Sequence, residues 1–298
     1  MPRRARLAAV IEKTSPARLV VTGAGGQVGQ ELLRRAETAA LPEPVALHRA
    51  ELDITDPAAV HAVLKPGDTV LNCAAFTAVD RAESDPESAF AVNATGAAVL
   101  AAACARVGAR LIHLSTDYVF PGTSDRPYEP DDPTGPATVY GRSKLEGERA
   151  VLDLAPDATV VRTSWVYAWS GSGFVDTMLR LERERDTLRV VNDQLGSPTY
   201  AADLAAALLE LAARPAGPRV LHATNAGETT WYDLARTIFA EVGADPARVL
   251  PCDSAAYPSP ARRPAYSVLS GRCWRAAGLT PLRPWREALR AALARRSH

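Results

Sequence analysis

The stretch Arg18-Leu-Val-Val-Thr-Gly-Ala-Gly-Gly-Gln-Val-Gly29 decides the fold of this chain. Its first five residues are mostly apolar and predict a short buried strand, and residues 31–37 predict a helix soon after the glycines. Gly23, Gly26 and Gly29 keep the turn tight and let the backbone approach a pyrophosphate at the helix N-terminus. A strand, a glycine turn and a helix in this order predict a nucleotide-binding unit.

Strand-like and helix-like segments alternate from this unit up to residue 163. The alternation predicts an α/β fold: a doubly wound parallel sheet of the Rossmann type over residues 18–163. Ligands bind such sheets at the carboxyl ends of the strands. The further strands are expected at 44–48, 69–75, 110–115 and 159–163, and the helices between them at 57–64, 87–107 and 140–154.

Beyond residue 163 the alternation loosens. We expect a smaller C-terminal substrate-binding lobe over residues 164–298, interleaved with late elements of the sheet domain. Residues 1–17 are interpreted as an N-terminal extension. The lobe is expected to hold helices at 174–184, 201–213, 230–242 and 285–296, a glycine-serine turn at 170–173, a polar loop at 193–199 and an irregular proline-rich loop at 251–264.

Composition excludes several classes of partner. Lys+Arg and Asp+Glu both total 34 in 298 residues, so nothing indicates nucleic acid or an anionic membrane. No uninterrupted apolar run is long enough for a membrane span.

The four cysteines lack the paired spacing of a metal site, and Cys73 and Cys104 lie in apolar runs as expected for core thiols. This usage indicates a reducing cytoplasm without disulfides.

The end of the second expected strand bears on the choice of cofactor. Proteins that bind NAD often carry an acidic residue there for the adenosine ribose, but this chain has His48 and Arg49. Arg49 could pair with a 2′-phosphate, which favours NADPH over NADH; an ordinary surface arginine is the alternative, and NADH stays possible. Ala74 and Ala75, at the end of the third strand, are small enough for a cofactor to lie against.

Tyr140 and Lys144 form the candidate proton donor. A tyrosine and a lysine at i and i+4 lie one turn apart on the same side of a helix. An ammonium group beside a phenol favours the phenolate, so the tyrosine pKa is expected to fall towards the working pH. Such a pair can protonate a forming alkoxide. Tyr-x-x-x-Lys is a weak motif alone, but the upstream glycine turn and Ser115-Thr-Asp117 strengthen it.

In this order the motifs resemble those of the extended short-chain dehydrogenase/reductases, and most closely the dTDP-4-dehydrorhamnose reductases. Several separated blocks that agree in order are far more specific than any one block, and together they cover the chain from residue 18 to its end. The blocks are Asn72-Cys-Ala-Ala-Phe-Thr-Ala-Val-Asp-Arg-Ala-Glu83, Ser115-Thr-Asp-Tyr-Val-Phe120, Arg162-Thr-Ser-Trp-Val-Tyr167, Asp193-Gln-Leu-Gly-Ser-Pro-Thr199 and Arg263-Pro-Ala-Tyr-Ser-Val-Leu269.

The resemblance implies a catalytic triad of Thr116, Tyr140 and Lys144 that reduces the C4 ketone of a nucleotide-linked deoxysugar. Tyr140 would donate the proton, Lys144 would hold the nicotinamide ribose, and Thr116 would bind the reacting oxygen. Substrate contacts are expected from Thr116, Asp117, Tyr118 and Trp165. Cofactor contacts are expected from Gly23, Gly26, Gln27, Val28, Gly29, His48, Arg49, Asp53, Ile54, Ala74, Ala75, Phe76, Thr77, Tyr140 and Lys144.

The residue after Asp117 separates reduction from elimination. Relatives that dehydrate sugar nucleotides carry Asp-Glu after the threonine, whereas this chain carries Asp117-Tyr118. The resemblance therefore implies reduction without loss of water. Some family members form magnesium-bridged dimers through glutamates, but those ligands cannot be matched here. We predict no metal site and expect a monomer or a homodimer.

Three functions remain in view. The leading hypothesis is an NADPH-dependent 4-ketoreductase that converts dTDP-4-dehydro-L-rhamnose to dTDP-L-rhamnose. The second keeps the chemistry but acts on another dTDP-linked 4-keto-6-deoxy sugar, as in antibiotic biosynthesis. The third is a regulatory nucleotide-binding subunit, since a relative of these reductases regulates methionine adenosyltransferase. The complete set of Thr116, Tyr140 and Lys144 favours an enzyme.

Overall fold

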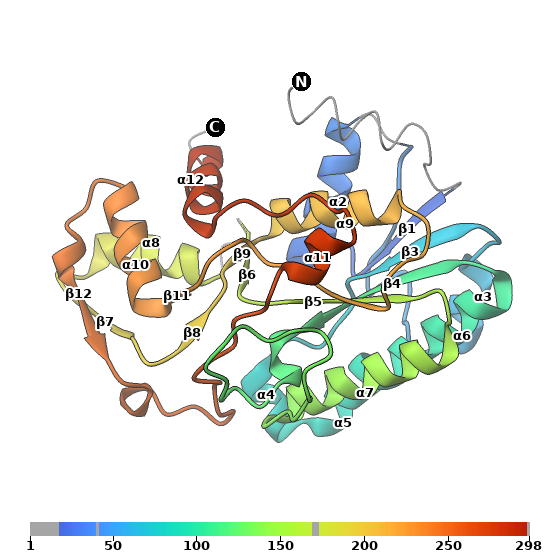
Figure 1. Ribbon diagram of the computed structural model, residues 1–298, viewed down its shortest axis with the longest axis horizontal. Helices are drawn as coiled ribbons and strands as arrows, with labels where there is room; N and C mark the ends of the chain where they lie inside the picture. The colour runs from blue at the N-terminus through green and yellow to red at the C-terminus, as the bar shows by residue number, and fades with distance from the viewer. Residues whose placement is uncertain (1–17, 40–41, 169–172, 297–298) are drawn as a thin grey trace.

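The computed structural model describes residues 18–39, 42–168 and 173–296, which form a sheet domain and a smaller lobe (Figure 1). Six parallel strands form the main sheet in the order β10-β5-β4-β3-β1-β2. The chain builds outward from β1 on both sides, so the predicted doubly wound parallel sheet is confirmed. The strands are β1 Arg18–Thr22, β2 Val45–Leu47, β3 Asp68–Asn72, β4 Arg110–Thr116, β5 Thr159–Thr163 and β10 Val220–His222.

Helices cover both faces of this sheet (Figure 1). On one face α2 (Gln27–Thr38) and α9 (Ala201–Ala212) pack with α11 (Arg272–Ala276) in one apolar cluster. On the other face α3 (Pro57–Val63), α6 (Ala97–Val107) and α7 (Val139–Leu154) pack in a second cluster. The central strands are buried on both sides, which explains why they appear in the sequence as continuous apolar runs.

The helix predicted over 87–107 contains an irregular turn. It runs as α5 (Pro86–Phe90), a π-helical turn (Ala91–Gly96) and α6. Such π turns insert one extra residue and often occur at functional sites. By length and composition alone Pro86–Val107 could cross a membrane, but half of its most apolar window is buried inside the protein, where the helix packs against α7.

The lobe lies beyond the carboxyl ends of the strands. Its core joins α8 (Phe174–Glu184), α10 (Trp231–Glu241) and α12 (Trp285–Arg296) through buried side chains such as Phe239 and Leu289. Short strand pairs complete it: β6 (Val166–Tyr167) with β9 (Thr199–Tyr200), β7 (Leu188–Val191) with β12 (Val249–Cys252), and β8 (Leu195–Gly196) with β11 (Thr229–Thr230).

Several predicted boundaries need correction. α2 begins at Gln27 rather than residue 31, because Gly26 already serves as its N-cap. β3 ends at Asn72 rather than residue 75, because the N–H of Ala74 turns back to the side chain of Asn72. The polar loop 193–199 holds β8, and the loop 251–264 begins inside β12. The proline inside β12 is tolerated because a two-stranded ribbon has edge positions where no backbone N–H group has to donate a hydrogen bond.

Other expectations have mixed outcomes. The helices predicted at 174–184, 201–213, 230–242 and 285–296 are present to within one residue. β10 and α11 had not been expected as separate elements. Residues 1–17 and 170–172, and with them the proposed extension and most of the glycine-serine turn, lie outside the described residues. All four cysteines are free; Cys104 is buried, whereas Cys73 is only half-buried.

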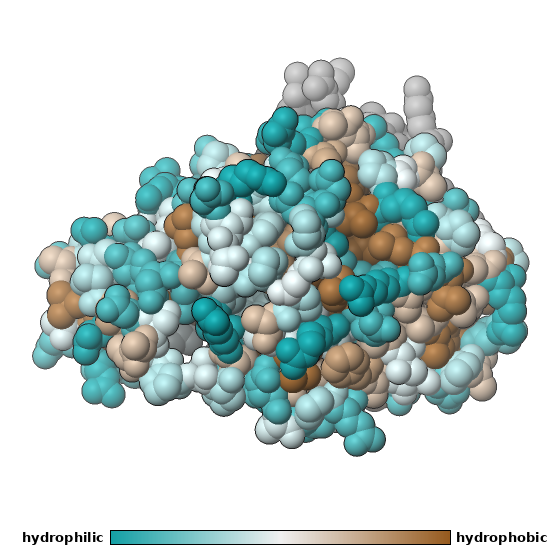
Figure 2. Space-filling view, turned by 60° about the horizontal axis from the view of Figure 1, so that its bottom comes forward, coloured by the Kyte–Doolittle hydropathy of each residue, from teal (hydrophilic) through white to brown (hydrophobic). Residues whose placement is uncertain are grey.

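The surface carries no broad apolar area on the face that Figure 2 shows, where hydrophobic residues stand in small groups among hydrophilic ones. Four large apolar residues are well exposed in the described chain, and they come from different elements or loops: Leu154, Val242, Leu250 and Tyr257. Scattered apolar residues of this kind are normal for a globular surface.

Candidate active site

The glycine turn between β1 and α2 is shaped for close backbone approach. Gly23 has a φ of +66°, and a Cβ there would lie 2.5 Å from the backbone nitrogen of Ala74. A Cβ on Gly29 would lie 2.5 Å from the carbonyl oxygen of Gly23, so neither position accepts a side chain. Gly26 places no side-chain cap on the first turn of α2. The N–H groups of such a helix N-terminus suit a phosphate group.

Gln27 supplies an independent test of this fit. Its Oε1 atom is buried and has no hydrogen-bond partner within the described chain. Buried polar atoms normally have a partner, so this amide favours a polar group bound at the turn. Val28, the next residue of α2, is buried. The turn and the amide together fit the pyrophosphate and ribose of a dinucleotide.

The second strand brings His48 to the same turn. A Cβ on Gly25 would lie 3.2 Å from Nδ1 of His48, so the imidazole lies directly against the glycines. Arg49 follows and is exposed. Asp53 accepts hydrogen bonds from the N–H and hydroxyl of Thr55 at 2.9 and 2.7 Å, which lower the pKa of Asp53. Ile54 next to it is buried.

The chain after β3 forms the opposite wall of the site, and Asn93, to which no sequence motif assigns a role, holds it in place. Asn93, in the π turn, accepts from the N–H of Phe76 at 2.8 Å and donates to its carbonyl oxygen at 3.1 Å. It also donates to the hydroxyl of Ser143 on α7 at 2.9 Å. Ala74 and Ala75 are half-buried in this segment, and Thr77 is exposed. In the sequence, the signal for the role of Asn93 is a polar residue inside an otherwise alanine-rich helix.

The proposed triad is assembled at the end of β4. Thr116 is the last residue of that strand and is followed by a 3₁₀ turn, while Tyr140 and Lys144 lie on α7. α7 begins behind Thr138, whose hydroxyl accepts from the N–H of Gly141 at 3.0 Å. A Cβ on Gly141 would lie 2.3 Å from the carbonyl oxygen of Tyr118. This close approach is what brings the helix onto the turn after β4.

Thr116 and Tyr140 meet, whereas the ammonium of Lys144 is engaged elsewhere. The hydroxyl of Thr116 donates to Asp117 Oδ1 at 2.9 Å and lies near enough to Tyr140 to favour the ionised phenol. Lys144 Nζ donates to the carbonyl oxygen of Leu114 at 2.7 Å and lies 3.4 Å from Nε2 of His113. All three triad side chains are almost completely buried.

Burial dominates the electrostatics of this site. It raises the pKa of Tyr140, and the neighbouring Thr116 hydroxyl offsets only part of the effect. The expectation that Lys144 would lower the tyrosine pKa is therefore wrong for this state. Burial lowers the pKa of Lys144 to about 8 and raises the pKa of Asp117 to about 6, although the hydrogen bond from the Thr116 hydroxyl opposes the latter shift.

Trp165 leads from the sheet into the lobe. It has a φ of +46°, a conformation that bulky residues rarely adopt, and its ring stacks on Trp231 with centroids 3.6 Å apart and planes 6° apart. A Cβ on Gly196 would lie 2.4 Å from the Trp165 ring. Trp231 donates from Nε1 to Gln194 at 3.1 Å. Strain of this kind is concentrated at functional sites. Trp231 is a residue of this site that no sequence motif indicates.

A partly open cavity borders the site. Tyr118, whose ring meets Tyr140 edge-on at 5.5 Å, lines it together with Thr138, Arg262 and Arg263. Arg263 bonds to Asp80 at 2.7 Å. Aromatic and cationic groups are therefore available beside the triad to a ligand that carries a ring and negative charge.

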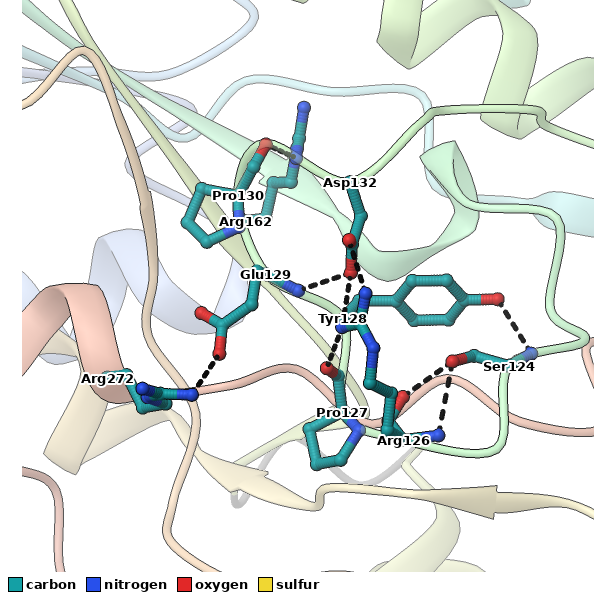
Figure 3. Close-up of polar contacts among 9 residues, drawn as sticks. All are labelled: Ser124, Arg126, Pro127, Tyr128, Glu129, Pro130, Asp132, Arg162 and Arg272. Atoms are coloured by element: carbon teal, nitrogen blue, oxygen red, sulfur yellow. Dashed lines mark hydrogen bonds and ion pairs between the residues drawn. The ribbon is translucent and has the colours of Figure 1, made fainter.

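The segment 121–136 is fastened over the sheet by its own polar contacts (Figure 3). Arg126 pairs with Asp132 through two bonds of 2.9 and 2.8 Å. Arg162 of β5 donates to the carbonyl oxygen of Pro130 at 3.0 Å. The hydroxyl of Tyr128 accepts three backbone N–H groups, those of residues 122, 123 and 124, at 3.0–3.1 Å. This segment is an ordered wall of the site.

No group of three or more His, Cys, Asp or Glu side chains that could hold a metal ion occurs within residues 18–39, 42–168 and 173–296.

Comparison with known proteins gives consistent matches over the whole fold. Residues 17–297 match the family model described as the RmlD substrate binding domain. The chain is 56% identical to the dTDP-4-dehydrorhamnose reductase of Mycobacterium tuberculosis over 282 residues, which cover 93% of this chain and 92% of that protein. It is 49% identical to the dTDP-4-keto-6-deoxy-D-glucose reductase of Streptomyces niveus, with 92% and 96% covered. The crystal structure of the Bacillus anthracis dTDP-4-dehydrorhamnose reductase in complex with NADP superposes with a TM-score of 0.88 at 35% identity, with 93% and 99% covered.

Proposed function

Because the chain belongs to the dTDP-4-dehydrorhamnose reductase family, we propose that it uses NADPH to reduce the C4 ketone of a dTDP-linked 4-dehydro-6-deoxyhexose. The observation that carries this proposal is the meeting of Thr116, the last residue of β4, with Tyr140 of α7: both side chains are buried, and Tyr118, two residues after Thr116, meets the Tyr140 ring edge-on. The sugar proposed first is dTDP-4-dehydro-L-rhamnose, with dTDP-L-rhamnose as product.

NADPH, when bound, supplies the hydride for C4 of the sugar. We assign its pyrophosphate to the turn at Gly23, Gly26 and Gly29 with Gln27, and its adenosine side to His48 and Arg49. The segment 74–77 forms the other wall, and Tyr140 and Lys144 are assigned to the nicotinamide ribose. The unpartnered Gln27 amide and the tight glycine contacts support this placement, and the NADP in the Bacillus anthracis structure supports the choice of cofactor.

Tyr140 acts as the acid. As hydride reaches C4, the carbonyl double bond opens and its oxygen takes the phenolic proton, so the ketone becomes a hydroxyl group. Burial favours the protonated phenol, which is the form that a reductase needs at this step. Thr116 holds the same oxygen in place through its hydroxyl. Asp117 and Tyr118 have no glutamate beside them, so no acid-base pair for elimination of water is supplied.

The sugar nucleotide is assigned to the side of the lobe. Trp165 and Trp231 are half-buried and stack on each other, and the accessible part of this aromatic pair can pack against a base or a sugar ring. Tyr118 and Arg263 line the adjoining cavity and suit the diphosphate and sugar. We therefore divide the work between the sheet, which binds the cofactor, and the lobe, which selects the substrate.

A second substrate deserves the same assay, because the Streptomyces niveus relative at 49% identity is named for dTDP-4-keto-6-deoxy-D-glucose. The test is incubation of the protein with each 4-keto sugar nucleotide and NADPH, followed by identification of the product by NMR. Formation of dTDP-L-rhamnose supports the first substrate, and a 4-hydroxy sugar from the second compound alone supports the other. NADPH binding without consumption of either sugar would instead indicate a regulatory nucleotide-binding protein.

We further propose a soluble cytoplasmic enzyme that acts as a monomer or homodimer without a metal. Light scattering on the purified chain gives the oligomeric state, and assays in EDTA with and without added magnesium give the metal dependence. A loss of activity in EDTA that magnesium restores would contradict the metal-free proposal.

A further inference from the structure

A polar chain crosses the apolar sheet directly beneath Lys144. Thr22 of β1, Asn72 of β3 and His113 of β4 are lateral neighbours in the strand register. Their side chains are all 0–1% exposed. Thr22 Oγ1 donates to Asn72 Oδ1 at 2.7 Å, Asn72 Nδ2 lies 2.8 Å from His113 Nδ1, and His113 Nε2 lies 3.4 Å from Lys144 Nζ. Buried polar side chains on three adjacent strands need a reason beyond packing.

The hydrogen-bond pattern fixes the position of the histidine proton. The backbone N–H of Ala74 donates to Asn72 Oδ1 at 3.1 Å, so that atom is the amide oxygen and the neighbouring Nδ2 is a donor. His113 Nδ1 must then accept. A neutral imidazole with an accepting Nδ1 carries its proton on Nε2, and Nε2 is the atom that faces Lys144.

A second donor opposite an ammonium group is unfavourable. An ammonium has three donors and no acceptor, so Nε2–H and a charged Lys144 cannot share a hydrogen bond. An uncharged amine can accept from Nε2–H while it donates to Leu114 at 2.7 Å. We propose that His113 is a positioning residue for Lys144: its Nε2–H, oriented through Asn72, holds the lysine nitrogen and favours the uncharged amine.

The other ionisable groups around Lys144 do not supply this bias. Glu148, one turn further along α7, and Cys73, after β3, both favour the charged lysine. Glu148 is bound to Arg162 of β5 by three bonds of 2.7–3.2 Å. Burial itself acts in the same direction as His113 and lowers the pKa of Lys144 to about 8. His113 remains neutral, since burial and Lys144 hold its pKa well below the ordinary value.

This inference goes beyond the proposed function and rests on it only for the role of Lys144. In the proposed reduction Tyr140 gives up its proton at each turnover, and a buried lysine that changes between ammonium and amine near neutral pH can take part in proton transfer at the site. His113 would thus set the pH range in which Lys144 changes its charge, although the proposed function gives His113 no contact with substrate or cofactor.

The sequence makes a direct measurement possible, because the chain has only three lysines: Lys13, Lys65 and Lys144. Lysine labelled with ¹³C at Cε gives three NMR signals, and the Lys144→Met variant identifies the signal of Lys144. In the substrate-free protein we expect its titration midpoint near pH 8. Long-range ¹⁵N spectra of the histidine rings should show His113 protonated at Nε2. Protonation at Nδ1 would overturn the proposal without any variant.

His113→Gln is the decisive variant, because an amide oxygen can then accept from the charged lysine. We expect the Lys144 midpoint to rise by about one pKa unit, the size of one exchanged hydrogen bond. Thr22→Val is the matched control: it cuts the same polar chain at its far end, but Ala74 still orients the Asn72 amide, so the midpoint should stay unchanged. An unchanged midpoint in His113→Gln, or an equal rise in Thr22→Val, would refute the role of Nε2–H.

Both measurements are independent of turnover. A protein that shows this coupling but reduces no sugar would refute the proposed function alone. If His113→Gln does not fold, the ring spectra of the unaltered protein still decide the question.

Discussion

Two buried cations lie against the same helix in opposite situations. Arg162 is bound to Glu148 of α7 by a fork of hydrogen bonds and lies over the Phe120 ring at 4.9 Å. Lys144, one turn earlier on α7, is equally buried, but its nearest partners are a neutral imidazole and a carbonyl oxygen. The difference indicates that Arg162 has a structural role and Lys144 a chemical one. A cation paired with a carboxylate holds its proton and its place, whereas one without such a partner can change its charge.

The sharpest test of the chemical side is Tyr140→Phe, which removes the proposed acid and keeps the ring. General acid catalysis is worth about 10²–10⁴-fold, so kcat should fall by that factor while NADPH binding and Tm remain close to the original values. The control is Tyr257→Phe, at an exposed tyrosine whose hydroxyl bonds to the carbonyl oxygen of Arg189 in β7, and it should leave kcat unchanged. A Tyr140→Phe enzyme that works at the original rate would leave the Tyr140 helix as ordinary scaffold.

Glu148→Gln tests the structural role of Arg162, because it leaves this arginine without its counter-charge. Removing one partner of a buried ion pair typically costs about 3–5 kcal/mol of unfolding free energy. Urea denaturation measures this loss. Arg180 and Glu184 form an exposed pair at 2.6 Å, and Glu184→Gln should cost less than about 1 kcal/mol. Equal losses in the two variants would show that burial of the Arg162 pair has no special weight.

Lys144→Met should slow turnover and weaken NADPH binding, yet it should not destabilise the protein. The pKa of Lys144 is lowered to about 8 in the folded protein, from an ordinary value of 10.5. Below pH 8 the folded protein bears the full cost of a buried ammonium group. Between pH 8 and 10.5 the unfolded chain binds more protons, so the stability of the unaltered protein should rise relative to Lys144→Met, by at most about 3 kcal/mol.

Urea titrations of both proteins at pH 7 and pH 10 measure this change. A stability difference that is the same at both pH values would mean that Lys144 stays charged in the fold, as Arg162 does, and the contrast between the two cations would disappear.

Arg49 is a third cation to set beside Arg162 and Lys144, and unlike them it is exposed. Arg49→Ala should reduce the preference for NADPH over NADH, because a charge-assisted bond to the 2′-phosphate is worth about 1.5–3 kcal/mol before solvent screening. The ratio of kcat/KM for the two cofactors should therefore fall by roughly tenfold, and less at high salt. An unchanged ratio would transfer the phosphate contact to another residue, with His48 as the next to test.

The smallest effect is expected where no charge is involved. Trp165→Ala removes the stack with Trp231, and aromatic contacts of this kind contribute about 0.5–1.5 kcal/mol beyond area burial. The KM of the sugar nucleotide should rise by roughly tenfold or less, with little change in NADPH affinity. If NADPH affinity falls and the sugar KM does not, Trp165 belongs to the cofactor site.

The sequence predicted the sheet domain well because each of its elements carries a local signal. The buried strands are continuous apolar runs, and Pro57 and the glycines mark helix starts. The sites of Thr116 and Tyr140 followed from motifs at strand and helix ends. What failed depended on contacts distant in sequence. No sequence signal near Lys144 indicates that its side-chain nitrogen bonds to the carbonyl oxygen of Leu114 and lies beside His113. The pKa of Tyr140 is set mainly by burial, which is a property of the assembled fold.

The lobe was harder for the same reason. Its two-residue strands, such as Leu195–Gly196, have no periodicity to detect, and they exist because a partner strand more than thirty residues away pairs with them. Trp231 begins an ordinary amphipathic helix in the sequence, and only the fold brings it onto Trp165. Helices of ten or more residues in the lobe were predicted because their pattern is local.

The position of β10 at the end of the sheet has a consequence for synthesis on the ribosome. In the sheet β5 pairs with β4 on one edge and with β10 on the other, so its second edge has no partner strand until Val220–His222 is made. At about 5–20 residues per second, residues 164–222 take roughly 3–12 s to make. During that time an apolar strand with unpaired N–H and C=O groups is exposed to neighbouring chains. The nascent protein is therefore most vulnerable to aggregation in this interval, and chain termination between residues 163 and 220 should produce insoluble fragments.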